Sequence, residues 1–480
     1  QTDSTSAFLD RLFDGPEFTN AFWGALVVDA ETGDTLYARN AGKSFVPASN
    51  AKLYTTTAAL DLFPPDTRLE TRLYARGPIS NGRLDGDLIV RGGGDPSIGP
   101  RFEDSSYTAT FDQWADALKS SGISLVTGRI IGDDDLFDDE WLGAGWTFDD
   151  ATYYYAAQIG ALTYNDNTID ASVKGNRPGQ PATVTWEPNN TTYVQMINET
   201  TSTPRGSGID EGYERLRGTN RIEITTEVAQ GTTETEALTV ENPTGYFVHV
   251  MGETLKRNGV RVWGDGVDID DLADEKKPDY DDLRLIATHY SPPMDSLISI
   301  LNKRSQNLYA ETMLRLVGTK YVAPPNMDED DALDVGSASA GVWVARHGTW
   351  ARAGVDTANV KLRDGSGLSR YTVITPGMTV ALLRYAHSHP SMEYRRAFYD
   401  SLPIGGVDGT LRSRFRGEPA EGNVRAKTGT LGGASSLAGY VTTASGRRLA
   451  FSLMCNHYTS STSAVRNAQD AAVNRLAQLR

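Results

Sequence analysis

The pattern of hydrophobic and polar residues predicts both helices and strands at the start of the chain. Residues 6–14 space their hydrophobic side chains as a short amphipathic helix does. Two apolar runs, Gly24–Ala30 and Thr35–Ala38, flank the polar segment Glu31–Asp34, which is typical of a β-hairpin. A helical pattern then covers Ser49–Phe63 and stops before two prolines.

The middle of the chain, from residue 66 to about residue 285, has a different pattern. Short alternating runs separated by Gly, Asn, Asp and Pro predict many β-strands and few strong helices. The region ends in an acidic, proline-containing stretch, Asp265–Asp282, which we interpret as a surface linker or loop. The runs that carry the strand prediction are Leu69–Ala75, Gly86–Val90, Gly128–Ile131, Ala182–Glu187 and Arg221–Glu227.

Helical patterns return in the C-terminal part of the chain. A second acidic surface loop is expected at Pro324–Asp334. Because hairpins at the two ends of the chain can share one antiparallel sheet with helices packed on it, we expect an α/β (α+β) domain interrupted by the β-rich middle region. The predicted helices cover Met294–Val317, Ser337–Ala353, Pro376–Ser388 and about Ser463–Leu479, and the predicted hairpin strands cover Leu437–Thr442 and Leu449–Asn456.

Composition and charge exclude several classes of function. The chain has 480 residues, and its 46 Lys and Arg against 62 Asp and Glu give a formal charge of −16. Such a chain lacks the excess of cations that binds nucleic-acid phosphates or an anionic membrane, so we expect neither partner. Because Cys455 is the single cysteine, the chain can form no internal disulfide and no Cys₄ or Cys₂His₂ zinc site, and we expect no metal or cofactor.

The sequence shows neither a membrane-spanning segment nor a leader. No run approaches the ~18 uninterrupted apolar residues of a transmembrane helix. The chain begins with the polar residues QTDSTS, as expected of a mature chain whose signal peptide is absent or already removed. A disulfide-free chain fits the cytosol but is equally compatible with an exported bacterial protein.

Candidate chemistry begins with a serine and a lysine three residues apart. A serine hydroxyl needs a base to become a nucleophile, and the GxSxG elbow of Ser–His–Asp hydrolases is absent. Among the lysines, only Lys52 has a serine three residues before it, Ser49. On a helix both side chains then share one face, and Ser49 opens the predicted helix, where the free amides favour negative charge. An N-cap serine beside an unrelated lysine would have the same pattern.

Two further short motifs follow in a specific order. Ser305–Asn307 (SQN) lies between helical patterns, and Lys427–Thr430 (KTGT) lies in a strand-like segment followed by two glycines. Taken alone, the first is an ordinary polar stretch and the second an ordinary strand segment. The order SxxK, SxN and KTG, however, is typical of penicillin-binding proteins and serine β-lactamases.

With these motifs the chain resembles the class C, low-molecular-mass penicillin-binding proteins, which are D-alanyl-D-alanine carboxypeptidases and endopeptidases of the penicillin-binding protein 4 (DacB) type. The resemblance implies a transpeptidase-like catalytic domain of the penicillin-binding-protein and serine β-lactamase fold, formed by residues 1–65 and 286–480. Residues 66–285 are then an inserted β-rich region with two nested subdomains. Other stretches similar to the family are Phe45–Leu53, Gly86–Pro96, Ser291–Glu311, Asp364–Arg370, Leu402–Leu411 and Ala426–Val441.

The resemblance also implies a catalytic role for five motif residues. Ser49 attacks the carbonyl between the last two D-alanines of a peptidoglycan stem peptide, D-alanine leaves, and the acyl-serine ester is hydrolysed. Lys52 is the candidate base in acylation, with a pKa lowered by the second cation, Lys427. Ser305 is a candidate proton shuttle to the leaving nitrogen, and Asn307 orients Lys52 and binds the substrate amide.

Other residues are implied as substrate contacts. The hydroxyls of Thr428 and Thr430, beside the charge of the motif lysine, suit the terminal D-alanine carboxylate, and Gly429 of the same motif is a further substrate-binding candidate. A glycine next to such a strand, as at Gly432–Gly433, lets the substrate backbone approach closely. The backbone amides of Ser49 and Thr430 would form the oxyanion hole. The same strand, if it is a sheet edge, can pair with the substrate backbone.

Weaker candidates lie outside the three motifs. Asp138 and Asp139, in the acidic run Asp133–Glu140, can meet the cationic end of the diamino acid in the stem peptide, although a solvated loop explains the run equally simply. Arg370 is a candidate substrate contact or a structural residue. We expect peptidoglycan stem peptides as substrate, β-lactams as inhibitors, and a location on the periplasmic or cell-wall side of the membrane.

Two other functions remain open at this point. A β-lactamase would differ only in rapid deacylation, but Ser305 stands where class C β-lactamases have tyrosine. A non-catalytic cell-wall-binding protein could keep the fold, although three intact motifs argue against it. The persistence of a penicilloyl adduct, and the release of D-alanine from a pentapeptide, distinguish the three.

Overall fold

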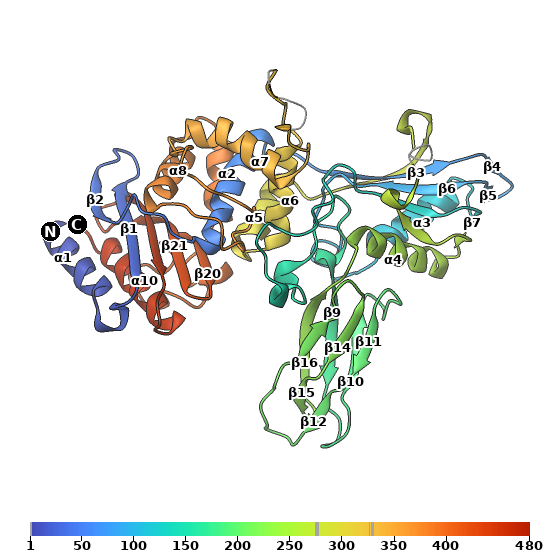
Figure 1. Ribbon diagram of the computed structural model, residues 1–480, viewed down its shortest axis with the longest axis horizontal. Helices are drawn as coiled ribbons and strands as arrows, with labels where there is room; N and C mark the ends of the chain where they lie inside the picture. Colours follow the sequence, from blue (N-terminus) through green and yellow to red (C-terminus); the bar gives the residue numbers. More distant parts are fainter. Residues whose placement is uncertain (1, 274–277, 326, 328–330) are drawn as a thin grey trace. The chain divides into compact units, whose positions relative to one another are not determined.

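The structure, a computed structural model, describes residues 2–273, 278–325, 327 and 331–480. The chain divides into two compact units. Unit 1 contains the chain up to Thr67, the short segment Gly143–Trp146, and Pro293–Arg480. Unit 2 contains Arg68–Leu142 and Thr147–Pro292. Both ends of the chain, blue and red in Figure 1, therefore belong to unit 1.

Unit 1 is built on a five-stranded antiparallel sheet in which the two ends of the chain meet (Figure 1). Its strand order is β2-β1-β22-β21-β20, and β1 pairs with β22 along its whole length. The predicted sharing of one antiparallel sheet by the two terminal hairpins is therefore confirmed. The strands are β1 (Phe22–Asp29), β2 (Thr35–Arg39), β20 (Arg425–Leu431), β21 (Ala434–Thr442) and β22 (Arg448–Asn456).

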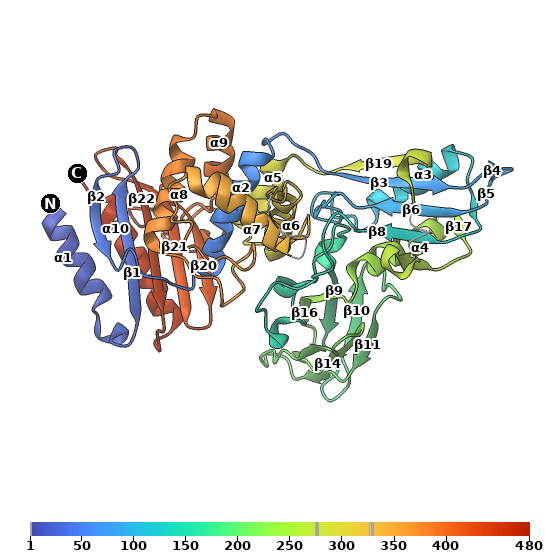
Figure 2. The same ribbon diagram turned by 45° about the horizontal axis from the view of Figure 1, so that its top comes forward.

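Helices cover both faces of this sheet (Figure 2). α1 (Thr2–Phe13) and α10 (Thr462–Ala477) lie on one face, where Leu9 and Leu476 share a core with Phe451 of the sheet. The other face carries α2 (Lys52–Leu62), α5 (Met294–Lys303), α6 (Asn307–Gly318), α7 (Ala338–Ala345), α8 (Pro376–Ser388) and α9 (Met392–Ser401).

Four of these helices differ from the sequence prediction. The pattern over Met294–Val317 is divided into α5 and α6, because Ser305 between them has a φ of 60° that an α-helix does not allow. α7 ends at Ala345 and continues as a π-helical turn, and α9 was not predicted. α9 carries one main signal of a helix start, Ser391, whose hydroxyl accepts a hydrogen bond from the Tyr394 amide.

Unit 2 begins with a mixed five-stranded sheet, of order β18-β8-β6-β3-β19, next to a four-stranded sheet, of order β17-β7-β5-β4. Helices α3 (Ala109–Ser120) and α4 (Pro243–Arg257) pack on this part through Phe111 and Phe247, whose ring centroids lie 5.0 Å apart. The strands are β3 (Glu70–Arg76), β4 (Ile79–Ser80), β5 (Arg83–Leu84), β6 (Asp87–Arg91), β7 (Leu125–Val126), β8 (Ile130–Asp133), β17 (Arg261–Val262), β18 (Gly266–Asp268) and β19 (Arg284–Tyr290).

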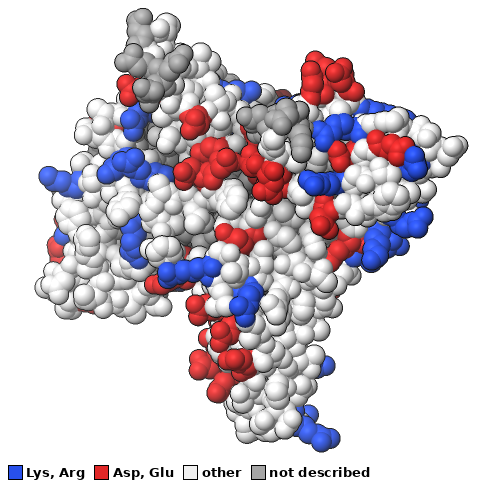
Figure 3. Space-filling view, turned by 45° about the vertical axis from the view of Figure 1, so that its right-hand side comes forward, with Lys and Arg blue, Asp and Glu red and all other residues white. Residues whose placement is uncertain are grey.

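The remaining strands of unit 2 form separate small sheets, which project as a lobe in Figure 1. They are β10-β9-β16, β11-β14-β13 and β12-β15. Figure 3 shows acidic side chains gathered along one side of this lobe. On β13 and β14, Glu214 is paired with Glu223, whose pKa is raised by the charge of Glu199. The strands are β9 (Thr168–Lys174), β10 (Thr183–Glu187), β11 (Gln195–Asn198), β12 (Thr201–Thr203), β13 (Tyr213–Arg215), β14 (Arg221–Ile224), β15 (Glu227–Ala229) and β16 (Thr233–Thr239).

The structure agrees with the few strong helices predicted for unit 2 and corrects one other expectation. The region contains two well-formed helices, and α4 begins with a strong signal that we missed, because Asn242 caps it and Pro243 occupies its first turn. The acidic stretch Asp265–Asp282 is more than a linker, since β18 within it pairs with β8. Its residues 274–277 lie outside the described part of the chain, as do residues 326 and 328–330 of the other predicted acidic loop.

Candidate active site

Ser49 and Lys52 face each other at the start of α2. Ser49 lies in a 3₁₀ turn, Ala48–Ala51, that leads directly into α2, so the predicted helix begins with a tighter turn. The preceding residue, Ala48, has a φ of 48°, a conformation that residues other than glycine rarely adopt and that often marks functional sites. Lys52 Nζ donates a hydrogen bond of 3.0 Å to Ser49 Oγ.

Lys52 is completely buried, and its ammonium nitrogen is surrounded by oxygen atoms. It donates to Asn307 Oδ1 at 2.6 Å and to the Ser366 carbonyl at 2.8 Å as well as to Ser49. Burial lowers the pKa of Lys52 to about 7, although the negative charges of Asp364 and Glu311 act in the opposite direction. Near neutral pH, a substantial fraction of Lys52 can therefore be uncharged and accept a proton.

The second motif is placed by the break between two helices. Ser305, at its left-handed φ, ends the connection after α5, and Asn307 is the first residue of α6. This turn directs the two side chains to different lysines. Asn307 accepts a hydrogen bond from Lys52, and Ser305 Oγ accepts one of 2.8 Å from Lys427 Nζ.

Lys427 is carried by β20, the strand at one edge of the sheet. Its ammonium group is buried and also donates to the Thr428 carbonyl at 2.9 Å. Burial, reinforced by the charge of Lys52, holds the pKa of Lys427 well below its usual range. The sequence predicted that Lys427 lowers the pKa of Lys52. Burial is instead the main cause for Lys52, and the effect of one lysine charge on the other appears at Lys427.

Gly429 allows β20 to lie directly against the turn that contains Ser49. A Cβ atom at Gly429 would come within 2.5 Å of the Pro47 carbonyl oxygen and 3.0 Å of the Ser49 backbone nitrogen. The two segments are also joined by Asn50 Nδ2, which donates to the Lys427 carbonyl at 2.8 Å. The backbone at Gly429 therefore packs directly against the turn that contains Ser49.

The two threonines of the third motif have partners that the sequence did not indicate. The Oγ1 atoms of Thr428 and Thr410 lie 2.7 Å apart. Arg466 of α10 donates to Thr430 Oγ1 at 3.2 Å, so a guanidinium lies beside the proposed carboxylate site. No local pattern marks Thr410 or Arg466, because both reach the strand from distant parts of the sequence.

A buried loop after residue 363 positions Lys52 from the other side. Glu311 accepts hydrogen bonds of 2.9 Å from the amides of Gly365 and Ser366, which fixes the carbonyl that Lys52 contacts. Asp364 accepts from Trp146 Nε1 at 3.1 Å and from the Ser369 amide at 2.8 Å. The stretch Asp364–Arg370 was noted in the sequence, but only Arg370 was chosen from it as a candidate.

The weaker candidates belong to different units of the chain. Arg370 is exposed and donates to the Gly432 carbonyl at 3.0 Å, which connects its loop to the end of β20. Asp138 is partly buried and Asp139 is exposed, and both belong to unit 2. Cys455, on β22, is buried as expected.

Unit 2 holds a cluster of carboxylates from the two acidic stretches Asp133–Glu140 and Asp265–Asp282, which the sequence did not predict to meet. Oxygen atoms of Asp134, Asp268 and Asp270 lie within 4.8 Å of one another, a spacing that could hold a metal ion. Burial and the charge of Asp268 raise the pKa of Asp134 to about 7, and burial raises that of Asp268 to about 6. Thr244 donates to Asp134 Oδ2 at 2.6 Å.

No helix in the described part of the chain is long and apolar enough to cross a membrane.

Comparison with known proteins identifies relatives along almost the whole chain. Residues 5–479 match the D-Ala-D-Ala carboxypeptidase 3 (S13) family. A D-alanyl-D-alanine carboxypeptidase from Actinomadura sp. (strain R39) is 34% identical over 98% of this chain and 84% of its own length. The crystal structure of penicillin-binding protein 4 (dacB) from Haemophilus influenzae superposes with a TM-score of 0.81 at 23% identity, covering 98% of this chain and 99% of that one. The same protein in complex with a β-lactam gives a TM-score of 0.75, with the same identity and coverage.

Proposed function

The chain belongs to the D-Ala-D-Ala carboxypeptidase 3 (S13) family, and we propose that Ser49 is the nucleophile of this serine DD-peptidase. Its substrate is the terminal D-Ala-D-Ala bond of peptidoglycan stem peptides. The observation that carries the proposal is the hydrogen bond from Lys52, a lysine whose pKa is lowered to about 7, to the serine hydroxyl. Such a contact between a nucleophile and a base is the geometric requirement for covalent catalysis.

Acylation follows from this geometry. Uncharged Lys52 accepts the Ser49 proton as Oγ attacks the carbonyl carbon of the penultimate D-alanine. The oxyanion that forms is stabilised by the backbone amides of Ser49 and Thr430, a contribution of roughly 10²–10³ in rate for one such donor. The proton then reaches the leaving nitrogen through Ser305, which receives a hydrogen bond from Lys427. D-Alanine departs, and the acyl group remains as an ester on Ser49.

Deacylation reverses the proton transfers with water in place of the leaving amine. Water loses a proton to the same relay and attacks the ester carbonyl, and the Ser49 oxygen recovers its proton as the shortened peptide leaves. Asn307 holds Lys52 by the 2.6 Å hydrogen bond throughout. It keeps the lysine nitrogen directed toward Ser49.

Substrate binding is assigned to the edge strand β20. The terminal carboxylate is placed beside the hydroxyls of Thr428 and Thr430, where Arg466 supplies positive charge and the bound carboxylate favours the protonated form of Lys427. The substrate backbone adds to the edge of the sheet as a further strand. A side chain at Gly429 would crowd the Ser49 turn on which this alignment depends.

We also propose roles for the two parts of the chain and a location for the protein. We assign catalysis to residues 1–65 and 286–480 and treat residues 66–285 as an insertion with two nested subdomains. Asp138 and Asp139 of the insertion receive the cationic end of the third stem residue, and Arg370 contacts the substrate. Because peptidoglycan lies outside the cytoplasmic membrane, the protein is exported, and β-lactams acylate it in place of the stem peptide.

Labelling with a fluorescent penicillin tests the nucleophile. We expect the intact chain to be labelled covalently and Ser49→Ala to lose all labelling. Ser445→Ala, an exposed serine in the turn between β21 and β22, is the matched control and should be labelled normally. Labelling of the Ser49→Ala variant would disprove the assignment. D-Alanine release from a pentapeptide, compared with cleavage of a cross-linked dimer, measures the preference between carboxypeptidase and endopeptidase activity.

A further inference from the structure

Unit 1 contains a cavity of about 290 Å³ lined by residues of α8, α9, β21 and β22. Four of its lining residues, His387, Arg395, Arg396 and Arg448, are basic, and the rings of Tyr399 and Tyr440 form part of its wall. The motif residues around Ser49 do not line it. A basic cavity is unexpected in a chain whose formal charge is −16.

Two of the arginines in this cavity have no acidic partner among the residues that the structure describes. The one carboxylate in the lining, Asp400, forms ion pairs of 3.6 Å with Arg396 and 3.5 Å with Arg425. Within the part of the chain that the structure describes, no carboxylate lies within ion-pair distance of Arg395 or Arg448. The cavity therefore keeps an excess of positive charge.

The aromatic rings hold part of this charge in a fixed place. The Arg448 and Arg425 guanidinium carbons lie 4.8 Å and 4.6 Å from the centre of the Tyr399 ring. Tyr399 packs against the buried ring of Tyr440, with centroids 5.7 Å apart. Tyr440 Oη donates to the Leu383 carbonyl at 2.6 Å, which anchors the wall to α8.

We propose that this cavity binds an oxyanion, a phosphate or carboxylate group, through Arg395, Arg448 and His387. A guanidinium offers paired N–H donors that match the oxygen spacing of either group, and stacking on Tyr399 leaves Arg448 less freedom to lose on binding. The site is separate from the peptidase function, and its ligand is a group other than the bond that Ser49 attacks.

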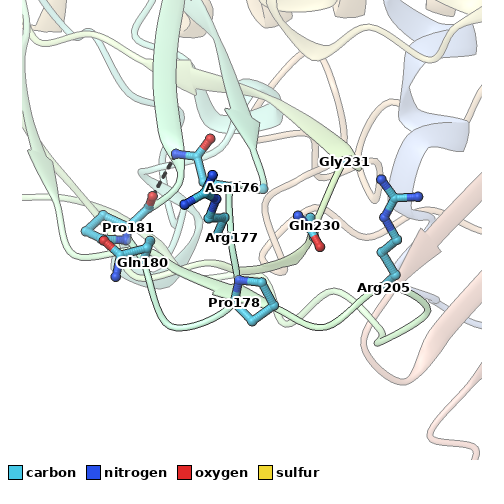
Figure 4. A pocket seen from close by; sticks show the side chains of 9 residues that line it. Asn176, Arg177, Pro178, Gln180, Pro181, Arg205, Gln230 and Gly231 are labelled. Atoms are coloured by element: carbon cyan, nitrogen blue, oxygen red, sulfur yellow. Dashed lines mark hydrogen bonds between the residues drawn. The ribbon is translucent and has the colours of Figure 1, made fainter.

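A second hollow contains arginines but lacks the aromatic residues and the histidine of this cavity. In unit 2, a larger and more open hollow of about 900 Å³ has Arg177 and Arg205 among its lining residues (Figure 4). Both arginines are exposed, and no aromatic ring or histidine lines the hollow. No aromatic ring in its lining therefore fixes the position of either guanidinium. A substitution of Arg205 removes the same charge as one in the proposed site and serves as a control.

His387 makes binding depend on pH. Burial lowers the pKa of His387, and the charges of Arg448 and Arg395 act in the same direction, while Glu31 and Asp29 oppose them. A bound anion stabilises the protonated imidazole and raises this pKa. Affinity for the anion should therefore increase as the pH falls through the pKa of His387.

The test uses NMR of the chain labelled at its six histidines and follows their imidazole signals. Inorganic phosphate, glycerol 3-phosphate and acetate are titrated separately at constant ionic strength, and His387→Asn identifies the signal. We expect a saturable shift of the His387 signal and a rise in its pKa. Saturation by both phosphates but not by acetate assigns a phosphate group, and saturation by acetate as well assigns a general oxyanion site.

Charge-matched variants separate a site from general screening. Arg395→Gln, at an exposed position that should not affect folding, is expected to weaken binding about tenfold, as does Arg448→Gln. Arg205→Gln and Lys43→Gln remove the same charge elsewhere and should leave the affinity unchanged. The proposal is overturned if no anion gives a saturable shift, or if all four variants weaken binding equally. Circular dichroism and thermal unfolding establish that each variant is folded.

Discussion

Two clusters of buried ionisable groups respond to burial in opposite directions. In unit 1 the pKa values of Lys52 and Lys427 fall, whereas in unit 2 those of Asp134 and Asp268 rise. The physical cause is the same, because a group removed from water favours its uncharged form. A shifted pKa alone therefore does not distinguish an active site from a structural cluster.

The difference lies in what surrounds the uncharged group. Lys52 contacts a serine hydroxyl, an amide oxygen and a backbone carbonyl. Of these three groups only the hydroxyl carries a proton that an uncharged Lys52 can accept. Asp134 accepts from Thr244, while its other oxygen, Oδ1, is buried and has no hydrogen-bond partner within the described residues. Burial therefore leaves an uncharged amine beside a hydroxyl in the first cluster, and a buried oxygen without a hydrogen-bond partner among the described residues, at a cost in stability, in the second.

The largest expected effect tests whether Lys52 must lose its proton. Lys52→Arg keeps a positive charge but cannot become neutral near pH 7. We expect the rate of acylation by fluorescent penicillin to fall by about 10²–10⁴, the usual contribution of a general base. Lys43→Arg, an exposed lysine in the same unit, should acylate normally. Wild-type kinetics in Lys52→Arg would remove Lys52 from the role of base.

An intermediate effect tests the carboxylates around Lys52. Since the base must be neutral, acylation should rise with pH through the pKa of Lys52, which is about 7. The charge of Asp364 raises that pKa, so Asp364→Asn should move the rising limb to lower pH, by on the order of one unit. Stopped-flow acylation from pH 5 to 9 measures the shift, and Asp34→Asn in the exposed β1–β2 turn is the control. An unmoved limb would show that Asp364 does not tune the base.

The smallest effect concerns stability and belongs to unit 2. Between pH ~4 and ~7, Asp134 is protonated in the folded chain and ionised in the unfolded chain, so stability falls as the pH rises through this window. Asp134→Asn should be more stable than the wild type at pH 8, by on the order of 2 kcal/mol, and equally stable near pH 4. Thermal unfolding at both pH values measures this, with exposed Asp139→Asn as the control. A wild type that gains the same stability at pH 8 from added calcium would show that a metal ion occupies the cluster instead.

Much of unit 1 could be predicted because its signals are local. The hairpin residues and the helix at Pro376–Ser388 follow from hydrophobic spacing and from proline and capping positions. The Ser49–Lys52 contact follows from helical geometry alone. The family match confirms the fold class and the DD-peptidase function that the order of the three motifs indicated.

The remaining site residues could not be predicted because tertiary packing brings them together. Thr410 and Arg466 meet the motif threonines only after the sheet and α10 have assembled. The left-handed turn at Ser305 interrupts a continuous helical pattern, and no glycine marks it. Burial, the main cause of the lowered pKa of Lys52, depends on the whole fold and leaves no local pattern in the sequence. For that reason the pKa shift was attributed to Lys427, which the motif made visible.

The pairing of β1 with β22 has a consequence for how the chain folds. The Val46 amide, three residues before the nucleophile, donates to Asn456 Oδ1 at 2.8 Å, across 410 positions of sequence. Contacts of such high sequence separation are intrinsically slow to form, because closing a long loop costs conformational entropy. The turn that contains Ser49 therefore lacks this hydrogen bond until β22 has paired with β1, so the last strand of the sheet helps to hold a turn near the start of the chain.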